Sequence, residues 1–162
     1  MNYYNQISEG YEELHKEEQL EKIAIIKLLL NPKPTDKLLD VGYGTGLTTQ
    51  PWKCERYGID PAKKLLEKAR DRKNIEYRLA KAESIPYKDN YFDYVISITA
   101  IQNFEDIKKG LKEIKRVGKD KFVLTYLKKS PKAQKINKLI HKLFNVEKEI
   151  EQDKDIIFVV GF

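Results

Sequence analysis

The sequence contains very few of the features that mark secreted, metal-stapled or membrane-bound proteins. Its 162 residues include one cysteine, Cys54, which excludes an internal disulfide and a four-cysteine zinc site. The longest apolar run, residues 23–30, is broken by Lys27 and is too short to span a bilayer. No basic segment followed by an apolar one opens the chain, so we expect no secretion signal. These absences predict a single cytoplasmic domain over residues 1–162, with no membrane span and no metal.

Charge is plentiful, and it is mostly positive. Lysine and arginine number 31 against 25 aspartates and glutamates, which gives a formal net charge of +6. A positive surface favours an anionic partner such as RNA. Lysine- and glutamate-rich surfaces are also typical of proteins from hot environments, and composition alone leaves both interpretations open.

The order of predicted elements indicates an α/β fold. An amphipathic helix is predicted over Tyr11–Leu30, and the prolines at 32 and 34 end it. Strands are predicted over residues 37–41, 56–60, 75–80, 91–98 and 121–127, and helices over residues 62–70, 106–117 and 132–144. Two further β-prone segments, 146–151 and 156–161, flank a polar turn. The pattern predicts a Rossmann-like, doubly wound, mostly parallel seven-stranded sheet with a C-terminal antiparallel β-hairpin.

A glycine-rich loop directly after the first predicted strand carries the main functional signal. Asp40 is followed by glycines at 42, 44 and 46, which allow positive φ angles and close approach of a ligand to the backbone. The dinucleotide-binding pattern would need glycine at position 47, where Leu47 stands, and no Gly-Lys-Ser/Thr follows for a phosphate-binding P-loop. The competing interpretation is a tight turn that binds nothing.

A second acid, Asp60, ends the second predicted strand twenty positions after Asp40. A carboxylate at that place can accept hydrogen bonds from two neighbouring ribose hydroxyls. By itself, the pair Asp60-Pro61 would indicate only the start of a helix.

The segment from Asp40 to Gly46 resembles the first motif of the class I S-adenosylmethionine-dependent methyltransferase superfamily, an acid followed by x-Gly-x-Gly-x-Gly. The stretches Ala80–Tyr87 and Asn90–Ser97 are similar to those of its UbiE-like group (methyltransferase type 11). The resemblance implies that S-adenosylmethionine is the cofactor, with Asp40 near its ammonium group. The cofactor-binding residues it implies are Asp40, Gly42, Tyr43, Gly44, Gly46, Asp60, Pro61, Ala82, Glu83 and Ser97.

The sequence departs from the group's pattern at one position, and the likeness extends to the N-terminus. Where the group has an acid that holds the adenine amine, this sequence has Lys81, so we assign adenine to the Ala82 amide and to Glu83. The opening Tyr-x-x-Ile-x-x-x-Tyr-x-x-Leu also resembles the N-terminal lid of the group, in which Tyr4 or Tyr11 would cover the cofactor. An aromatic stripe of this kind can equally be core packing.

The segment Ser97–Phe104 follows the fourth predicted strand and should lie beside the transferable methyl group. Gln102 and Asn103 could hydrogen-bond a methyl acceptor, and Phe104 could stack on a planar one. Alternatively, Asn103 caps the next helix. No catalytic residue emerges from the sequence, because Cys54 lacks the Pro-Cys context of a methyltransferase nucleophile.

The acceptor is not fixed by these motifs. Residues 96–102 somewhat resemble ribosomal-RNA guanine methyltransferases, and with the positive charge this favours RNA as the acceptor. The alternatives are a quinone-type or other small metabolite, or a non-catalytic domain that binds only the cofactor or a partner. The same resemblance implies a small zinc-binding activator protein that would pair with the edge strand predicted at 75–80.

Overall fold

The computed structural model describes residues 2–69 and 74–162, and the chain divides into two compact units, Met1–Asn31 and Pro32–Phe162. The first unit consists of helix α1 (Asn2–Leu29). It begins earlier than the predicted start at Tyr11, because Gly10 lowers helix propensity without breaking the hydrogen-bond ladder as a proline would.

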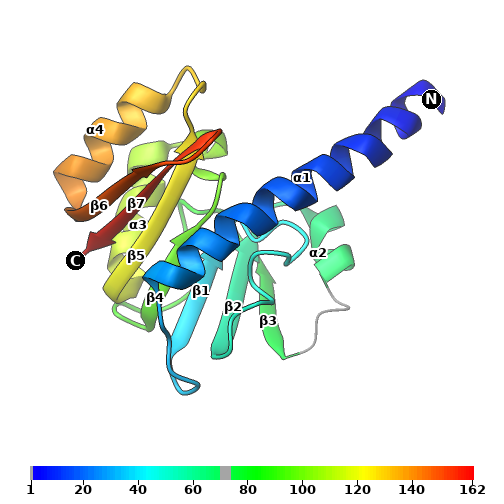
Figure 1. Ribbon diagram of the computed structural model, residues 1–162. Coiled ribbons are helices and arrows are strands. Elements are labelled where there is room, and N and C mark those ends of the chain that lie inside the picture. Colours follow the sequence, from blue (N-terminus) through cyan, green and yellow to red (C-terminus); the bar gives the residue numbers. More distant parts are fainter. Residues whose placement is uncertain (1, 70–73) are drawn as a thin grey trace. The chain divides into compact units, whose positions relative to one another are not determined.

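The second unit is built on one seven-stranded sheet (Figure 1). Its strands are β1 (Lys37–Val41), β2 (Glu55–Asp60), β3 (Ile75–Leu79), β4 (Phe92–Ser97), β5 (Gly118–Leu127), β6 (Asn145–Glu151) and β7 (Asp155–Gly161). The spatial order is β3-β2-β1-β4-β5-β7-β6. Neighbouring strands from β3 to β5 run parallel, and β7 runs antiparallel to both β5 and β6. The predicted Rossmann-like sheet with its antiparallel C-terminal hairpin is confirmed.

Helices α2 (Lys63–Ala69), α3 (Ile107–Val117) and α4 (Ala133–Leu143) connect the strands, with a short 3₁₀ helix η1 (Ile101–Asn103) after β4. Helices α3 and α4 pack against each other and against β5. Asp106 caps α3, because its side chain accepts a hydrogen bond of 3.1 Å from the Lys109 backbone N–H. The cap is therefore Asp106 and not Asn103, the alternative that the sequence left open.

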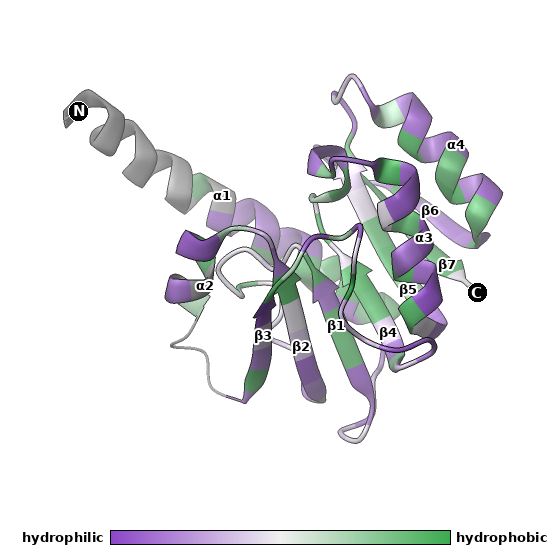
Figure 2. Ribbon diagram, turned by 180° about the vertical axis from the view of Figure 1, so that it is seen from behind, coloured by the Kyte–Doolittle hydropathy of each residue, from purple (hydrophilic) through white to green (hydrophobic). Residues whose placement is uncertain are grey.

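The core of this unit lies between the sheet and its helices. Hydrophobic residues concentrate in β1, β4 and β5, and the exposed sides of α3 and α4 are hydrophilic (Figure 2). Fully buried members of the core include Leu39, Val95, Leu111, Phe122 and Phe158. No helix in the described part of the chain combines the length and the apolar character needed to cross a membrane.

Candidate cofactor-binding site

The order in which the chain adds strands reverses between β1 and β4. From β1 the chain adds β2 and β3 on one side, and it then returns to add β4 and β5 on the other side. In open α/β sheets, ligands bind at the carboxyl ends of the strands at such a switch point. The loops after β1 and β4 come together there, because a Cβ added at Gly42 would lie 2.6 Å from the Ala100 Cβ. The predicted glycine loop therefore occupies the position where this fold binds ligands.

All three glycines of the loop have left-handed backbone angles. The φ values are +81° at Gly42, +59° at Gly44 and +85° at Gly46, a region that residues with a side chain rarely adopt. Residues 44–51 form turns, in which the Gly46 N–H donates to the Tyr43 carbonyl and the Thr49 N–H to the Gly46 carbonyl. The loop thus presents bare backbone at the switch point.

Asp40 is fully buried next to this loop. Its Oδ2 accepts hydrogen bonds from the hydroxyls of Thr48 at 2.6 Å and Thr49 at 2.8 Å, whereas Oδ1 has no hydrogen-bond partner among the described residues. Burial raises the pKa of Asp40 to about 6, although the two threonines lower it. A buried carboxylate oxygen without a donor is a fitting counterpart for a ligand ammonium group. The sequence interpretation had not included the threonines.

Asp60 joins the glycine loop to the next helix. Its Oδ2 accepts a hydrogen bond of 3.1 Å from the Gly44 N–H, and its Oδ1 accepts one of 2.8 Å from the Ala62 N–H. Because each carboxylate oxygen can accept more than one hydrogen bond, the two oxygens keep capacity for a pair of ribose hydroxyls. Pro61 lies at this turn, on the wall of the neighbouring pocket.

Tyr43 supports the loop from inside the protein. Its side chain is buried, and its ring lies 4.6 Å from the ring of Tyr77, measured between centroids. A Cβ at Gly58 in β2 would lie only 2.7 Å from the Tyr43 Cδ1. Burial raises the Tyr43 pKa to about 12. Gly58, which the sequence interpretation did not select, is thus required for the Tyr43 ring to pack where it does.

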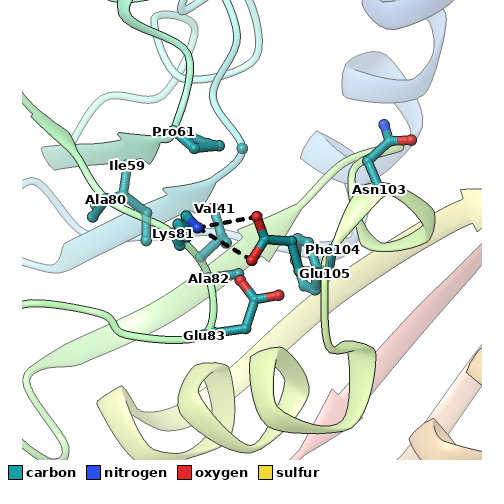
Figure 3. A pocket seen from close by; sticks show the side chains of 11 residues that line it. Val41, Ile59, Pro61, Ala80, Lys81, Ala82, Glu83, Asn103, Phe104 and Glu105 are labelled. Atoms are coloured by element: carbon teal, nitrogen blue, oxygen red, sulfur yellow. Dashed lines mark hydrogen bonds and ion pairs between the residues drawn. The ribbon is translucent and has the colours of Figure 1, made fainter.

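A pocket of about 110 Å³ opens beside the glycine loop (Figure 3). Its apolar lining comes from Val41, Ile59, Pro61, Ala80, Ala82 and Phe104. Lys81, Glu83, Asn103 and Glu105 supply its polar side chains. The Lys81 ammonium forms an ion pair with the Glu105 carboxylate at 3.0 Å, whereas the Glu83 carboxylate accepts a hydrogen bond of 2.8 Å from the Asp106 N–H. Glu83 therefore holds the start of α3 while it borders the pocket.

The segment after β4 is fixed by hydroxyl hydrogen bonds. Ser97 is buried and donates to the Val41 carbonyl at 2.9 Å, which ties β4 to β1. Thr99 has a φ of +54°, an uncommon and strained angle for a β-branched residue. Its N–H donates to the Thr125 hydroxyl at 2.8 Å, and its own hydroxyl donates to Asp155 at 2.7 Å. No sequence motif had indicated this network.

The structure places the three predicted acceptor-binding residues differently from one another. The Gln102 amide donates to the Thr99 carbonyl at 2.9 Å, and its Oε1 has no hydrogen-bond partner among the described residues. Asn103 is exposed at the pocket. Phe104 is buried, with its ring where a Gly110 Cβ would stand, and it lines the same pocket as Ala82. Phe104 therefore lies on the cofactor side of the site.

The remaining candidates lie elsewhere. The side chains of Tyr4 and Tyr11 fall outside the described part of the chain, so their predicted contact with the cofactor stays a prediction. Cys54 precedes β2, at the opposite end of that strand from Asp60, and burial raises the pKa of its thiol to about 11. A protonated thiol at that end of the sheet does not serve as a nucleophile at this site.

Comparison with known proteins agrees with this geometry. Residues 39–124 match the family described as "Methyltransferase domain". The chain is 30% identical over 142 residues to the demethylmenaquinone methyltransferase of Thermotoga maritima, covering 81% of this chain and 62% of that protein. It spans about half the length of the first curated relatives it matches, at 56% and 47%.

Two solved structures share the fold. The S-adenosylmethionine-dependent methyltransferase of Aquifex aeolicus superposes with a TM-score of 0.69 at 20% identity, over 90% of this chain and 88% of that one. A Haloferax volcanii methyltransferase, solved in complex with the Trm112 methyltransferase activator, superposes with a TM-score of 0.71 at 16% identity, over 86% of this chain and 87% of that one.

The fold and the site together define a class I methyltransferase domain whose cofactor is S-adenosylmethionine. The Asp40 oxygen without a donor fits the ammonium group of that cofactor. The left-handed glycines fit its methionine part, which would lie against the backbone, and the Asp60 carboxylate fits its ribose. With more than half of its length matched by the family, the chain belongs to the methyltransferase-domain family of the UbiE type.

Proposed function

We propose that this protein transfers the methyl group of S-adenosylmethionine to a small organic acceptor of quinone type. The observation that carries the proposal is the similarity to the demethylmenaquinone methyltransferase of Thermotoga maritima, which extends over 81% of the chain. The other curated quinone methyltransferases that match, including the UbiE protein of Rickettsia akari, support the same acceptor class.

The bound cofactor would supply an activated methyl group on a sulfonium ion. The residues of the chain then have to bind it, orient it and exclude water from the transfer. Asp40 would hold the ammonium end and Asp60 the ribose, so that the sulfonium lies near the glycine loop. The segment 97–102 would border the acceptor, with the Gln102 Oε1 available to accept a hydrogen bond from an acceptor hydroxyl.

A direct test is transfer of radiolabelled methyl from S-adenosylmethionine to demethylmenaquinone analogues, with bulk RNA and a protein fraction as parallel acceptors. We expect label in the quinone-type product and its loss in Gln102→Ala. Gln152→Ala, in the turn before β7, is the control that should keep the activity. Label in RNA alone would contradict the proposal.

RNA is the second candidate, and a specific observation favours it. Lys128, Lys129 and Lys132 lie on the loop after β5, and the Lys132 ammonium donates to the Gln102 carbonyl at 3.3 Å. The Lys132 ammonium therefore stands next to the segment expected to border the acceptor, which suits a phosphate group. The sequence had favoured RNA on net charge, but the names of the relatives reported above lend this preference no support.

A partner protein at the edge of the sheet is a further part of the proposal. β3 ends the strand order, and its Leu79 side chain is 47% exposed. At the opposite edge, β6 carries three glutamates and one lysine, and such charges discourage strand pairing. A small zinc-binding activator would add its strand to β3. Gel filtration of the chain with such a protein should show co-elution, and Tyr77→Pro in β3 should abolish it.

A further inference from the structure

Two carboxylates border the pocket beside the glycine loop, and they are engaged differently. The Glu83 carboxylate accepts the Asp106 backbone N–H and so belongs to the start of α3. The Glu105 carboxylate contacts only the Lys81 ammonium among the described residues, at 3.0 and 3.1 Å. Glu105 is therefore the pocket carboxylate that no backbone group engages.

The edge of an adenine ring presents one donor, the exocyclic amine, beside ring nitrogens that accept. The apolar walls formed by Ile59, Pro61 and Ala82 suit the faces of such a ring. The Lys81 ammonium and backbone N–H groups can only donate, so the amine needs an acceptor, and among the side chains that line the pocket only Asn103, Glu83 and Glu105 carry one. An ionised carboxylate offers about four acceptor positions, and the two contacts with Lys81 leave room for the amine.

We propose that Glu105 accepts a hydrogen bond from the exocyclic amine of adenine, and that Lys81 holds the Glu105 carboxylate in position. The inference rests on S-adenosylmethionine being the cofactor. It names Glu105, on the loop before α3, as a residue that determines nucleobase specificity.

The ion pair is suited to this role because it is exposed. The side chains of Lys81 and Glu105 are 57% and 71% exposed, so the pair itself adds little stability and can adjust when a nucleoside enters. A purine with a 6-oxo group would place an oxygen against the carboxylate, and the Lys81 ammonium could donate to that oxygen only by giving up part of its ion pair with Glu105. The pocket should therefore reject an inosine-type base.

The test is calorimetric titration of the full chain with S-adenosylhomocysteine and with S-inosylhomocysteine. The wild type should bind the adenine compound about tenfold more tightly or better, as expected for a hydrogen bond to a charged group. Glu105→Gln should reduce that ratio below about threefold, because an amide can also donate to the 6-oxo group. Glu151→Gln is the matched control, since Glu151 pairs with Lys128 at 3.2 Å and is 73% exposed.

Exchanging the charges of Lys81 and Glu105 provides a second test. Glu105→Lys alone should lose the preference for adenine, and the double variant Lys81→Glu/Glu105→Lys should recover it by returning a carboxylate to the pocket. An unchanged ratio in Glu105→Gln would overturn the proposal. A wild type that binds neither compound would overturn it together with the cofactor, whereas absence of methyl transfer to quinones would count against the acceptor alone.

Discussion

Asp40 is a carboxyl group that water does not reach, and this makes the domain sensitive to pH. Its pKa is raised from 3.8 to about 6 by burial, so between these values the native state binds a proton that the unfolded chain releases. The free energy of unfolding should therefore fall as pH rises through this window, by about 3 kcal/mol from this group. Urea denaturation of the ligand-free protein at several pH values from 4 to 7 measures this decrease in the free energy of unfolding.

The variant Asp40→Asn isolates this contribution, because an amide does not titrate there. The decline between pH 4 and 6 should be smaller in the variant than in the wild type by the same amount. Equal slopes for the two proteins would refute the assignment. Affinity for S-adenosylhomocysteine should behave in the opposite way, rising above pH 6 in the wild type as the carboxylate ionises, and staying weak throughout in Asp40→Asn.

Gly58 is needed in β2 because the Tyr43 ring leaves no room for a side chain there. Adding a methyl group in Gly58→Ala would force the Tyr43 ring away from β2, because the new Cβ would lie 2.7 Å from it. We expect a loss of about 1–3 kcal/mol in the free energy of unfolding, together with weaker cofactor binding as the glycine loop shifts. Gly161→Ala is the control, since its nearest neighbour is a flexible glutamate oxygen at 3.4 Å. Equal losses in both variants would contradict the prediction.

At the scale of elements, Arg116 joins helix α3 to the loop that precedes β4. Its guanidinium donates to the carbonyls of Ile85 and Tyr87, both at 2.9 Å, and to the Asp89 carboxylate at 2.8 Å. Lysine keeps the charge but cannot make these fixed, forked contacts. Arg116→Lys should therefore cost about 2 kcal/mol of unfolding free energy, measured in urea. Lys112→Ala, on the exposed side of the same helix, should cost far less unfolding free energy. A similar loss in both variants would argue against a stabilising role for the Arg116 hydrogen bonds.

The elements that the sequence predicted are those with a local signal. The strands follow from short β-prone apolar segments, and the glycine loop follows from the spacing of 42, 44 and 46. The Thr99–Thr125–Asp155 network could not be predicted, because its partners are 26, 30 and 56 positions apart in the chain. Glu105 was missed for the same reason, since its contact with Lys81 spans 24 positions.

At the scale of the whole molecule, the positive charge separates the two candidate acceptors. A neutral quinone-type acceptor gains little from a net charge of +6, so its kcat/KM should change by less than about twofold between 50 and 200 mM salt. An RNA acceptor contacted through several phosphates should lose at least about tenfold over the same range. Steady-state rates for both acceptors across this series decide between them.

The place of β7 in the sheet has a consequence for synthesis on the ribosome. β7 fills the gap between β5 and β6, so β6 has no neighbour to pair with until residues 155–161 have emerged from the exit tunnel. The parallel half, from β3 to β5, can assemble earlier, while the nascent chain exposes the unpaired edge of β5 to chaperones. Truncating the chain before residue 155 should leave that edge permanently exposed and increase aggregation of the protein.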